Sequence, residues 1–245
     1  MRAMVTGAGK RLGRAMALHL AGRGHDVAVH YATSHDEAEA VAAEIRAMGR
    51  RAVTIGADLL DEGQTETLIA RATEALDGPL TTLINNASIF EHDTLETATR
   101  DSWDRHIGSN LRAPFVLTQA FAAQLPPPPA RDGEPVAHGL VVNMIDQRVL
   151  KPDPRFFSYS LSRNALWWAT RTLAQALAPR VRVNGVGPGP TLASVHQTPA
   201  EFQGVKMRGL GPAFDTGLTA MGATTVSMPG SEVYQGLATG VIDAA

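Results

Sequence analysis

The regular alternation of short apolar segments with longer amphipathic segments along the first 190 residues is the feature that most constrains the fold. We expect strands over residues 2–6, 26–31, 52–56, 80–85, 139–145 and 180–186, and helices over residues 12–22, 35–48, 64–77, 99–124 and 158–178. Crossover connections between such strands make them parallel and place helices on both faces of the sheet. The sequence therefore predicts one α/β domain with a doubly wound parallel sheet. Prolines and glycines in residues 125–139 predict a surface loop there.

Composition narrows the class of function. The 245-residue chain has a formal net charge of −2, with 44% hydrophobic and 19% charged residues, which argues against disorder and against a nucleic-acid partner. We expect a small-molecule partner. The chain has no cysteine and eight scattered histidines, so disulfides are excluded and no metal site is expected. The N-terminus enters a strand at once, and no apolar run reaches about 18 residues, so we expect no signal peptide, no membrane span and a cytoplasmic location.

A glycine-rich turn joins the first expected strand to the first expected helix. Its sequence "VTGAGKRLG" has Gly7, Gly9 and Gly13, with Lys10, Arg11 and Leu12 inside the turn. Backbone amides and a helix N-terminus at this place can hold a pyrophosphate. A tight turn without a ligand is the alternative, but its position in the first strand–helix unit favours nucleotide binding.

The end of the second strand bears on the choice of cofactor. An acidic residue there would bind an adenosine 2′-hydroxyl and repel a 2′-phosphate, and "AVHYATS" has none. We therefore expect NADP rather than NAD. The candidate contacts at this end are His30, Tyr31, Thr33 and Ser34, with Lys10 or Arg11 nearby. For His30 and Tyr31, simple strand packing is the alternative.

Tyr159 and Arg163 lie four residues apart at the start of the expected helix 158–178, so they share one face. A cation close to a phenol favours the phenolate and lowers its pKa, which would prepare Tyr159 for proton transfer. We expect the neighbouring core stripe to consist of Leu161, Ala165, Trp168, Thr172 and Leu173.

Pro114 interrupts the expected helix 99–124. Proline lacks an N–H, so the carbonyl of Asn110 has no helical partner four residues later, and we expect a kink there. A kink without a chemical role is the alternative.

Together these residues resemble the short-chain dehydrogenase/reductase family, and within it the pteridine reductase branch. The resemblance covers residues 1 to about 200 and rests on "TGAGKRLG", "ADL" (57–59), "NNAS" (85–88), Asn110, Asp146, Tyr159 and "VNGVGPGPT" (183–191). It implies a Rossmann-like fold. It adds to the expected cofactor contacts Asp58 and Leu59 by the adenine, Asn85, Asn86 and Ala87 along the ribose, and Pro188 and Gly189.

The resemblance also implies chemical roles. Tyr159 would donate the proton and Asp146 would orient the substrate, while its charge raises the tyrosine pKa. Arg163 stands where the family has a lysine that lowers this pKa and binds the nicotinamide ribose; arginine keeps the charge but cannot relay a proton. The carbonyl of Asn110 would hold a water. Ser88 and Phe90 would bind substrate, with Phe90 stacked on the pterin ring; for Phe90, an ordinary hydrophobic loop residue is the alternative.

Residues 202–245 do not continue this family. They resemble a fragment of the periplasmic solute-binding proteins of tripartite ATP-independent transporters, in which the arginine matching Arg208 binds a substrate carboxylate. We do not expect this fragment to bind a carboxylate or to form an independent domain. Within it, "TTVSM" has strand character and Ser231 can cap a short helix. The domain expected for residues 1–200 is thus followed by an atypical tail, as in a fusion.

These observations predict an NADPH-dependent reductase that transfers hydride to a dihydropterin or a dihydrofolate, with activity impaired by Arg163. A carbonyl reductase of the same fold and a non-catalytic NADP-binding protein are the alternatives. The resemblance implies a homo-oligomer, a tetramer or a dimer.

Overall fold

The protein is built around a six-stranded parallel sheet. The computed structural model describes residues 1–189, 206–208, 219, 224–227, 239 and 241. The strands are β1 (Arg2–Val5), β2 (Asp26–Tyr31), β3 (Ala52–Gly56), β4 (Thr82–Asn85), β7 (Gly139–Met144) and β8 (Val181–Val186), in the order β3-β2-β1-β4-β7-β8, and every neighbouring pair is parallel. The order reverses between β1 and β4, and in such sheets ligands bind beyond the carboxyl ends of the strands at this point.

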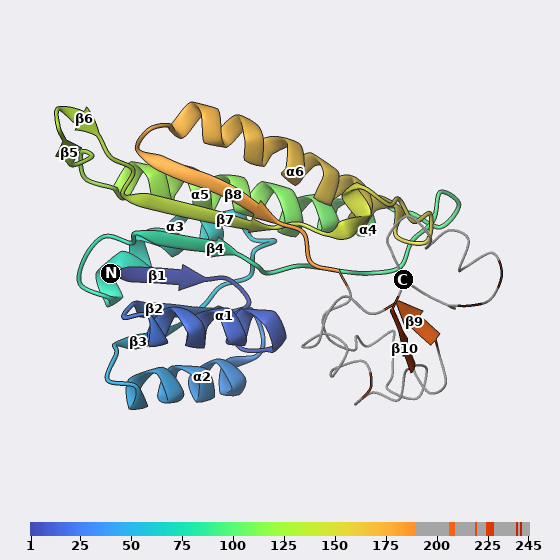
Figure 1. Ribbon diagram of the computed structural model, residues 1–245, viewed down its shortest axis with the longest axis horizontal. Helices are drawn as coiled ribbons and strands as arrows, with labels where there is room; N and C mark the ends of the chain where they lie inside the picture. The colour runs from blue at the N-terminus through green and yellow to red at the C-terminus, as the bar shows by residue number, and fades with distance from the viewer. Residues whose placement is uncertain (190–205, 209–218, 220–223, 228–238, 240, 242–245) are drawn as a thin grey trace. The chain divides into compact units, whose positions relative to one another are not determined.

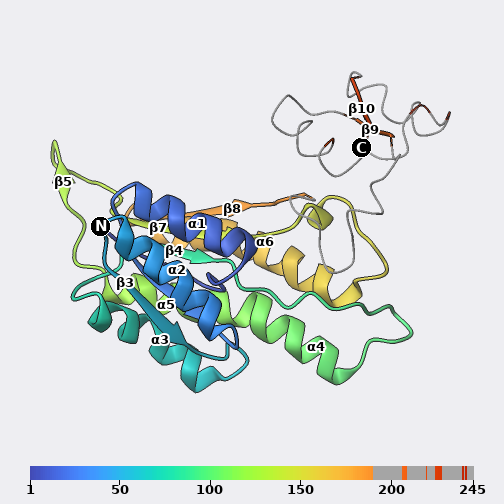
Figure 2. The same cartoon turned by 90° about the horizontal axis from the view of Figure 1, so that it is seen from below.

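Helices cover both faces of the sheet (Figures 1 and 2). They are α1 (Arg11–Gly22), α2 (His35–Ala47), α3 (Glu62–Ala75), α4 (Arg100–Ile107), α5 (Ala113–Gln124) and α6 (Phe157–Leu177). One apolar cluster packs α1 and α2 on the sheet and includes Ala17, Val41 and Ile45; the other packs α3 and α5 and includes Leu68 and Phe121. The doubly wound architecture predicted from the sequence is confirmed.

The long helix expected over residues 99–124 is interrupted by a π-helical turn rather than by a simple kink. α4 ends at Ile107, the π turn η1 covers Gly108–Arg112, and α5 follows with Pro114 in its first turn. Pro114 has no N–H to donate to the Asn110 carbonyl, and π turns are frequent at functional sites. Asn110 lies at its centre and is completely buried.

The segment expected as a plain loop contains a small hairpin. Strands β5 (Ala130–Arg131) and β6 (Glu134–Pro135) pair antiparallel, and both turn residues, Asp132 and Gly133, have positive φ. An Asp-Gly pair is a strong hairpin signal, so the sequence did contain this feature.

The buried face of α6 is mostly polar, and the expected core stripe is wrong for Leu161, Trp168 and Thr172, whereas Leu173 packs against the core. Leu161 and Trp168 are exposed, whereas Ser158, Ser162 and Thr170 are buried. These hydroxyls are satisfied locally: Ser162 donates to the Tyr159 carbonyl and Thr170 to the Leu166 carbonyl. Hydrophobic periodicity alone therefore predicted the wrong buried face of α6. Short hydroxyl side chains can donate hydrogen bonds to carbonyls of their own helix, so their burial costs little free energy.

Residues Pro190–Ala245 form a second compact unit. In it, β9 (Lys206–Arg208) and β10 (Thr224–Val226) pair in parallel, so the strand predicted at "TTVSM" is confirmed. The helix predicted from Ser231 and the expected boundary near residue 200 lie outside the described residues. No helix in the described part of the chain is long and apolar enough to cross a membrane, and these residues contain no cluster of potential metal ligands.

Candidate active site

Three side chains from β7 and α6 meet near the carboxyl end of the sheet. Tyr159, in the first turn of α6, donates a hydrogen bond of 2.8 Å from its hydroxyl to Oδ2 of Asp146, which follows β7. Arg163 lies one turn further along α6, and its guanidinium carbon is 5.3 Å from the centre of the Tyr159 ring. The sequence prediction that Tyr159 and Arg163 project to the same side therefore holds, and Asp146 joins them.

The balance of charges at Tyr159 differs from the sequence expectation. The Tyr159 side chain is buried, and burial is the largest influence, raising the pKa of its hydroxyl above the usual value; Arg163 lowers it and Asp146 raises it. The expectation that a nearby cation lowers this pKa was right in direction for Arg163 alone. The net shift is upward, because burial disfavours the phenolate. Tyr159 is therefore a protonated phenol at neutral pH, which suits a proton donor.

Arg163 is a buried cation with few partners. Its side chain is only 2% exposed, Nη1 donates to the Met144 carbonyl at 2.9 Å, and Nε has no hydrogen-bond partner among the described residues. A buried donor without an acceptor costs free energy. A ligand with hydroxyl groups beside α6 would relieve this cost.

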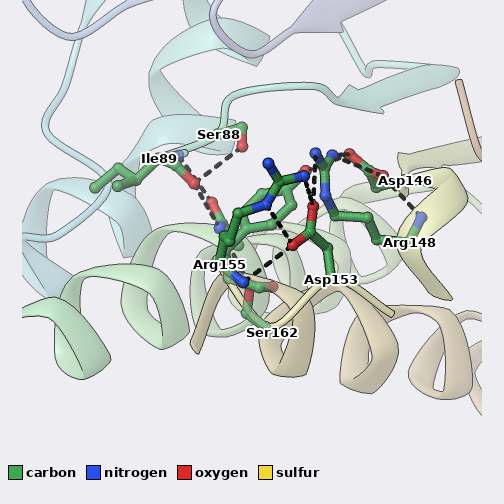
Figure 3. A network of polar contacts seen from close by, with 9 residues as sticks. Ser88, Ile89, Asp146, Arg148, Asp153, Arg155 and Ser162 are labelled. Carbon is green, nitrogen blue, oxygen red and sulfur yellow. Dashed lines mark hydrogen bonds and ion pairs between the residues drawn. The ribbon is translucent and has the colours of Figure 1, made fainter. Parts of the chain in front are cut away.

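Phe90 lies close to this group. Its ring stacks on Phe156 with centres 4.4 Å apart and meets the Tyr159 ring edge-on at 4.7 Å. The Ser88 side chain is exposed at the start of the same loop, where its hydroxyl donates to the carbonyl of Ile89 (Figure 3). Both predicted substrate residues thus lie on the loop after β4, with Phe90 in contact with Tyr159.

The Asn110 side chain connects the loop after β4 to α6 by hydrogen bonds. It accepts from the backbone N–H of Ile89 and donates to the Ile89 carbonyl, both at 2.9 Å, and it also donates to Ser162 on α6 at 3.2 Å. Sequence reasoning concerned only the backbone carbonyl of Asn110, and its role as a water holder stays a prediction. The structure adds a positioning role for its side chain.

A second buried network, which the sequence did not reveal, holds the start of α6. Ser158 donates from its hydroxyl to Asp93, and Asp93 also accepts the Ser158 backbone N–H at 3.0 Å. His106 of α4 is 2.6 Å from the same hydroxyl, and its Nε2 accepts from the backbone of Glu91. Burial lowers the pKa of His106, although Asp93 opposes the shift. The network fixes the residue before Tyr159 against the loop that carries Phe90.

The glycine turn is tightly folded and is held by hydrogen bonds within the chain. Gly7 has a φ of 61°, and a Cβ on Gly13 would come within 2.1 Å of the Gly7 carbonyl oxygen. The Asn86 side chain donates to the carbonyls of Thr6 and Gly7, and the Thr6 hydroxyl accepts from the backbone N–H groups of Asn86 and Ala87. Asn86 and Ala87 therefore lie against the turn, and their contact with the cofactor ribose stays a prediction.

His30 is a correction to the predicted phosphate contacts. It is buried, its Nδ1 accepts from the Gly7 N–H at 3.1 Å, and its Nε2 is 3.0 Å from the Ala57 carbonyl. Burial lowers its pKa to about 4, so it is neutral with the proton on Nε2. His30 supports the turn from behind and has no free nitrogen for a phosphate. Tyr31 packs on Gly56 and meets His35 edge-on, in keeping with the packing alternative.

The N-terminus of α1 is suited to an anion. Its N-cap residue, Lys10, forms no side-chain cap, and its first turn has no acidic residue, so the first amides of the helix retain their attraction for an anion. The Lys10 ammonium pairs with Glu37 of α2 at 2.7 Å. Arg11 and Leu12 open α1, Thr33 is exposed, and Ser34 lies at the start of α2 beside Gly9. These residues can hold a phosphate-bearing cofactor.

The remaining predicted contacts divide into exposed and buried residues. Asp58 is exposed just after β3, and its Oδ1 accepts from the backbone of Leu60, whereas Leu59 is buried. The Asn85 side chain is also buried and bonds Asn143 at 2.8 Å within the sheet. The Asn85 side chain therefore faces the interior of the sheet, and a contact of this residue with the ribose stays a prediction. The Pro188 carbonyl accepts from Gln147, and Gly189 follows at the end of the described segment.

Comparison with known proteins agrees with this geometry. The model of the short chain dehydrogenase family matches residues 1–203, so the chain belongs to this family. Residues 194–245 match the model of bacterial extracellular solute-binding proteins, family 7, which confirms the resemblance of the tail.

Relatives at moderate identity carry different activities. A short-chain type dehydrogenase/reductase from Picea abies is 32% identical over 197 residues, covering 77% of this chain and 69% of the relative. The 3-oxoacyl-[acyl-carrier-protein] reductase FabG of Staphylococcus epidermidis is 32% identical, covering 76% and 73%. Among solved structures, the FolM alternative dihydrofolate reductase 1 of Brucella suis, in complex with NADP, is 45% identical with a TM-score of 0.71, covering 78% of this chain and 76% of that one.

Proposed function

We propose that the protein is an NADPH-dependent reductase of the short-chain family and that its substrate is a dihydropterin or a dihydrofolate. The observation that carries the proposal is the hydrogen bond between the Tyr159 hydroxyl and the Asp146 carboxylate. A carboxylate beside the proton donor suits a heterocyclic substrate, because it can accept hydrogen bonds from ring N–H groups. A ketone offers no such donor, and this disfavours a carbonyl reductase. The Brucella suis neighbour, 45% identical, supports the choice of substrate class.

The turn and the start of α1 fit the cofactor. The absence of a Cβ on Gly13 permits the tight approach of α1 to the turn, and the uncapped helix end and Lys10 supply positive charge for phosphates. Arg163, with its unpaired Nε, would bind ribose hydroxyls. When bound, NADPH supplies the hydride.

The chain's own residues then supply orientation and a proton. Asp146 binds donor groups of the ring and sets its position against Tyr159. The Tyr159 hydroxyl turns from Asp146 to the substrate nitrogen and protonates it, which its raised pKa allows at neutral pH. Arg163 stabilises the phenolate that forms, because it is the nearby cation. It cannot return a proton itself, so reprotonation of Tyr159 through water limits turnover.

The test follows NADPH absorbance with dihydrobiopterin and dihydrofolate, for the parent protein and for Arg163→Lys. We expect turnover in the parent and faster turnover in Arg163→Lys, because lysine can relay a proton. NADPH binding without turnover in either protein would refute the reductase and favour a non-catalytic NADP-binding protein. Turnover with ketones but not with pterins would favour a carbonyl reductase.

We also propose a cytoplasmic homo-oligomer. Leu161 and Trp168 are 40% and 66% exposed on α6, and seven residues apart they lie on one helix face. An exposed apolar stripe of this kind favours association. The molar mass in solution, compared between the parent and Trp168→Glu, tests it: a monomeric parent would refute it.

A further inference from the structure

Arg148 lies at the substrate side of the site, two residues after Asp146. Its guanidinium carbon is 4.8 Å from the ring centre of Phe156 and 5.2 Å from that of Phe90. Figure 3 shows Arg148 between Asp146 and Asp153. Its side chain is 22% exposed, so it is partly buried against aromatic rings at a position that solvent and ligands still reach.

The guanidinium of Arg148 is poorly satisfied where it lies. Nη1 is 3.4 and 3.5 Å from the two oxygens of Asp146, Nη2 is 4.0 Å from Asp153, and Nε is buried with no hydrogen-bond partner among the described residues. Charge-assisted hydrogen bonds are normally 2.7–2.9 Å long. Asp153 instead binds Arg155 closely, at 2.8 and 3.0 Å. Arg148 therefore retains most of its capacity to bind an anion.

The surrounding segment has an excess of positive charge. Residues 146–155 contain three cations, Arg148, Lys151 and Arg155, and two acids, Asp146 and Asp153. Lys151 is exposed and forms no ion pair with any described residue. The field of this segment attracts a ligand with negative charge.

The Phe156 ring is only 9% exposed and stacks on Phe90, so both rings pack against the guanidinium of Arg148. The planar fork of Arg148 binds a carboxylate. We infer that Arg148 forms a subsite for the carboxylate-bearing tail of a folate, so that this protein binds folates more tightly than pterins with an uncharged side chain. This inference rests on the substrate class proposed above.

Binding measurements test it without any need for turnover. Isothermal titration of the NADP⁺-loaded protein with folate and with biopterin gives two dissociation constants, and their ratio is the readout. We expect folate to bind at least about tenfold more tightly, a difference of about 1.4 kcal/mol. Arg148→Gln should reduce the ratio to near one, and Arg148→Lys should keep part of it, because lysine retains the charge but loses the fork. Arg23→Gln, an exposed cation at the end of α1, is the matched control and should keep the parent's ratio.

Three results would overturn the inference: equal affinity of the parent for both ligands, an equal loss of both affinities in Arg148→Gln, or no binding of either ligand. An Arg148-dependent preference for folate in a protein that reduces neither dihydropterin nor dihydrofolate would keep the subsite and refute the proposed activity. Reduction of both substrates without such a preference would refute the subsite and keep the proposed activity.

Discussion

Replacement of Gly13 by alanine tests whether the glycine turn binds the cofactor. The added Cβ would lie 2.1 Å from the Gly7 carbonyl oxygen and 2.7 Å from Nδ2 of Asn86. Ordinary contact begins near 3.4 Å, so the Gly7 peptide must move by about 1.3 Å. This movement disturbs the hydrogen bonds that Asn86 donates to the carbonyls of Thr6 and Gly7.

The magnitude follows from three contributions. Overpacking costs about 1–3 kcal/mol, and each weakened hydrogen bond costs about 1 kcal/mol. Alanine in a helix gains about 1 kcal/mol over glycine. The net loss is about 3 kcal/mol, which lowers Tm by about 6–12 °C in a protein of this size. NADPH affinity should fall at least about tenfold, because the turn that faces the phosphates has moved.

Gly22→Ala is the matched control on the same helix. Gly22 ends α1, and a Cβ there meets nothing within 4 Å, so the substitution should raise Tm slightly and leave NADPH binding unchanged. The assays are thermal unfolding by circular dichroism and NADPH titration by fluorescence. If Gly13→Ala unfolded at the parent's Tm and bound NADPH equally well, the close packing of α1 on the turn would be wrong.

Three further substitutions test the support of the glycine turn, the proton donor and the binding of the cofactor phosphate. In the unfolded protein His30 has its ordinary pKa of about 6.5, whereas in the folded protein its pKa is about 4. Between these pH values the unfolded state binds more protons than the folded state. The free energy of unfolding should therefore fall by about 3 kcal/mol as the pH falls from 6.5 to 4. Urea unfolding across this range should show a flatter dependence for His30→Gln, and an unchanged slope would contradict the assignment. Tyr159→Phe should lower kcat by at least about 100-fold with NADPH affinity nearly unchanged, and the parent's reductase activity should decline only in alkali, because the pKa of Tyr159 is raised; a decline near pH 7 would show that another group donates the proton. Glu37→Gln should release Lys10 and tighten NADPH binding about two- to fivefold with no effect on NADH, and equal gains for both cofactors would argue against Lys10 as a contact of the 2′-phosphate.

The sequence predicts the architecture well, because the period of apolar residues and the order of the strands and helices can be read from local stretches of sequence. The six strands of the sheet and the helices of residues 1–189 lie within about two residues of their expected bounds, except that a π turn divides the helix expected over residues 99–124. The pairing of Tyr159 with Asp146 follows from their places after β7 and at the start of α6. The burial of a side chain, in contrast, depends on residues that are distant in the sequence. The upward pKa shift of Tyr159 and the inward orientation of His30 both depend on what covers them, and no pattern in the sequence shows this.

The same limit explains the error on α6. Leu161 and Trp168 looked like core residues by hydrophobicity, yet the helix turns Ser162 and Arg163 inward. Buried polar residues at this place serve the site: Ser162 accepts from Asn110, and Arg163 lies beside Tyr159. A conflict between local pattern and observed burial is expected where function overrides packing.

The support of the glycine turn by His30 and Asn86 has a thermodynamic consequence. Because both side chains already hold the turn through hydrogen bonds, the incoming dinucleotide does not have to order it. Association should therefore proceed with little loss of chain entropy, and heat capacity measurements should report only the surface that the ligand itself covers. A turn folded in advance in this way behaves as a rigid receptor.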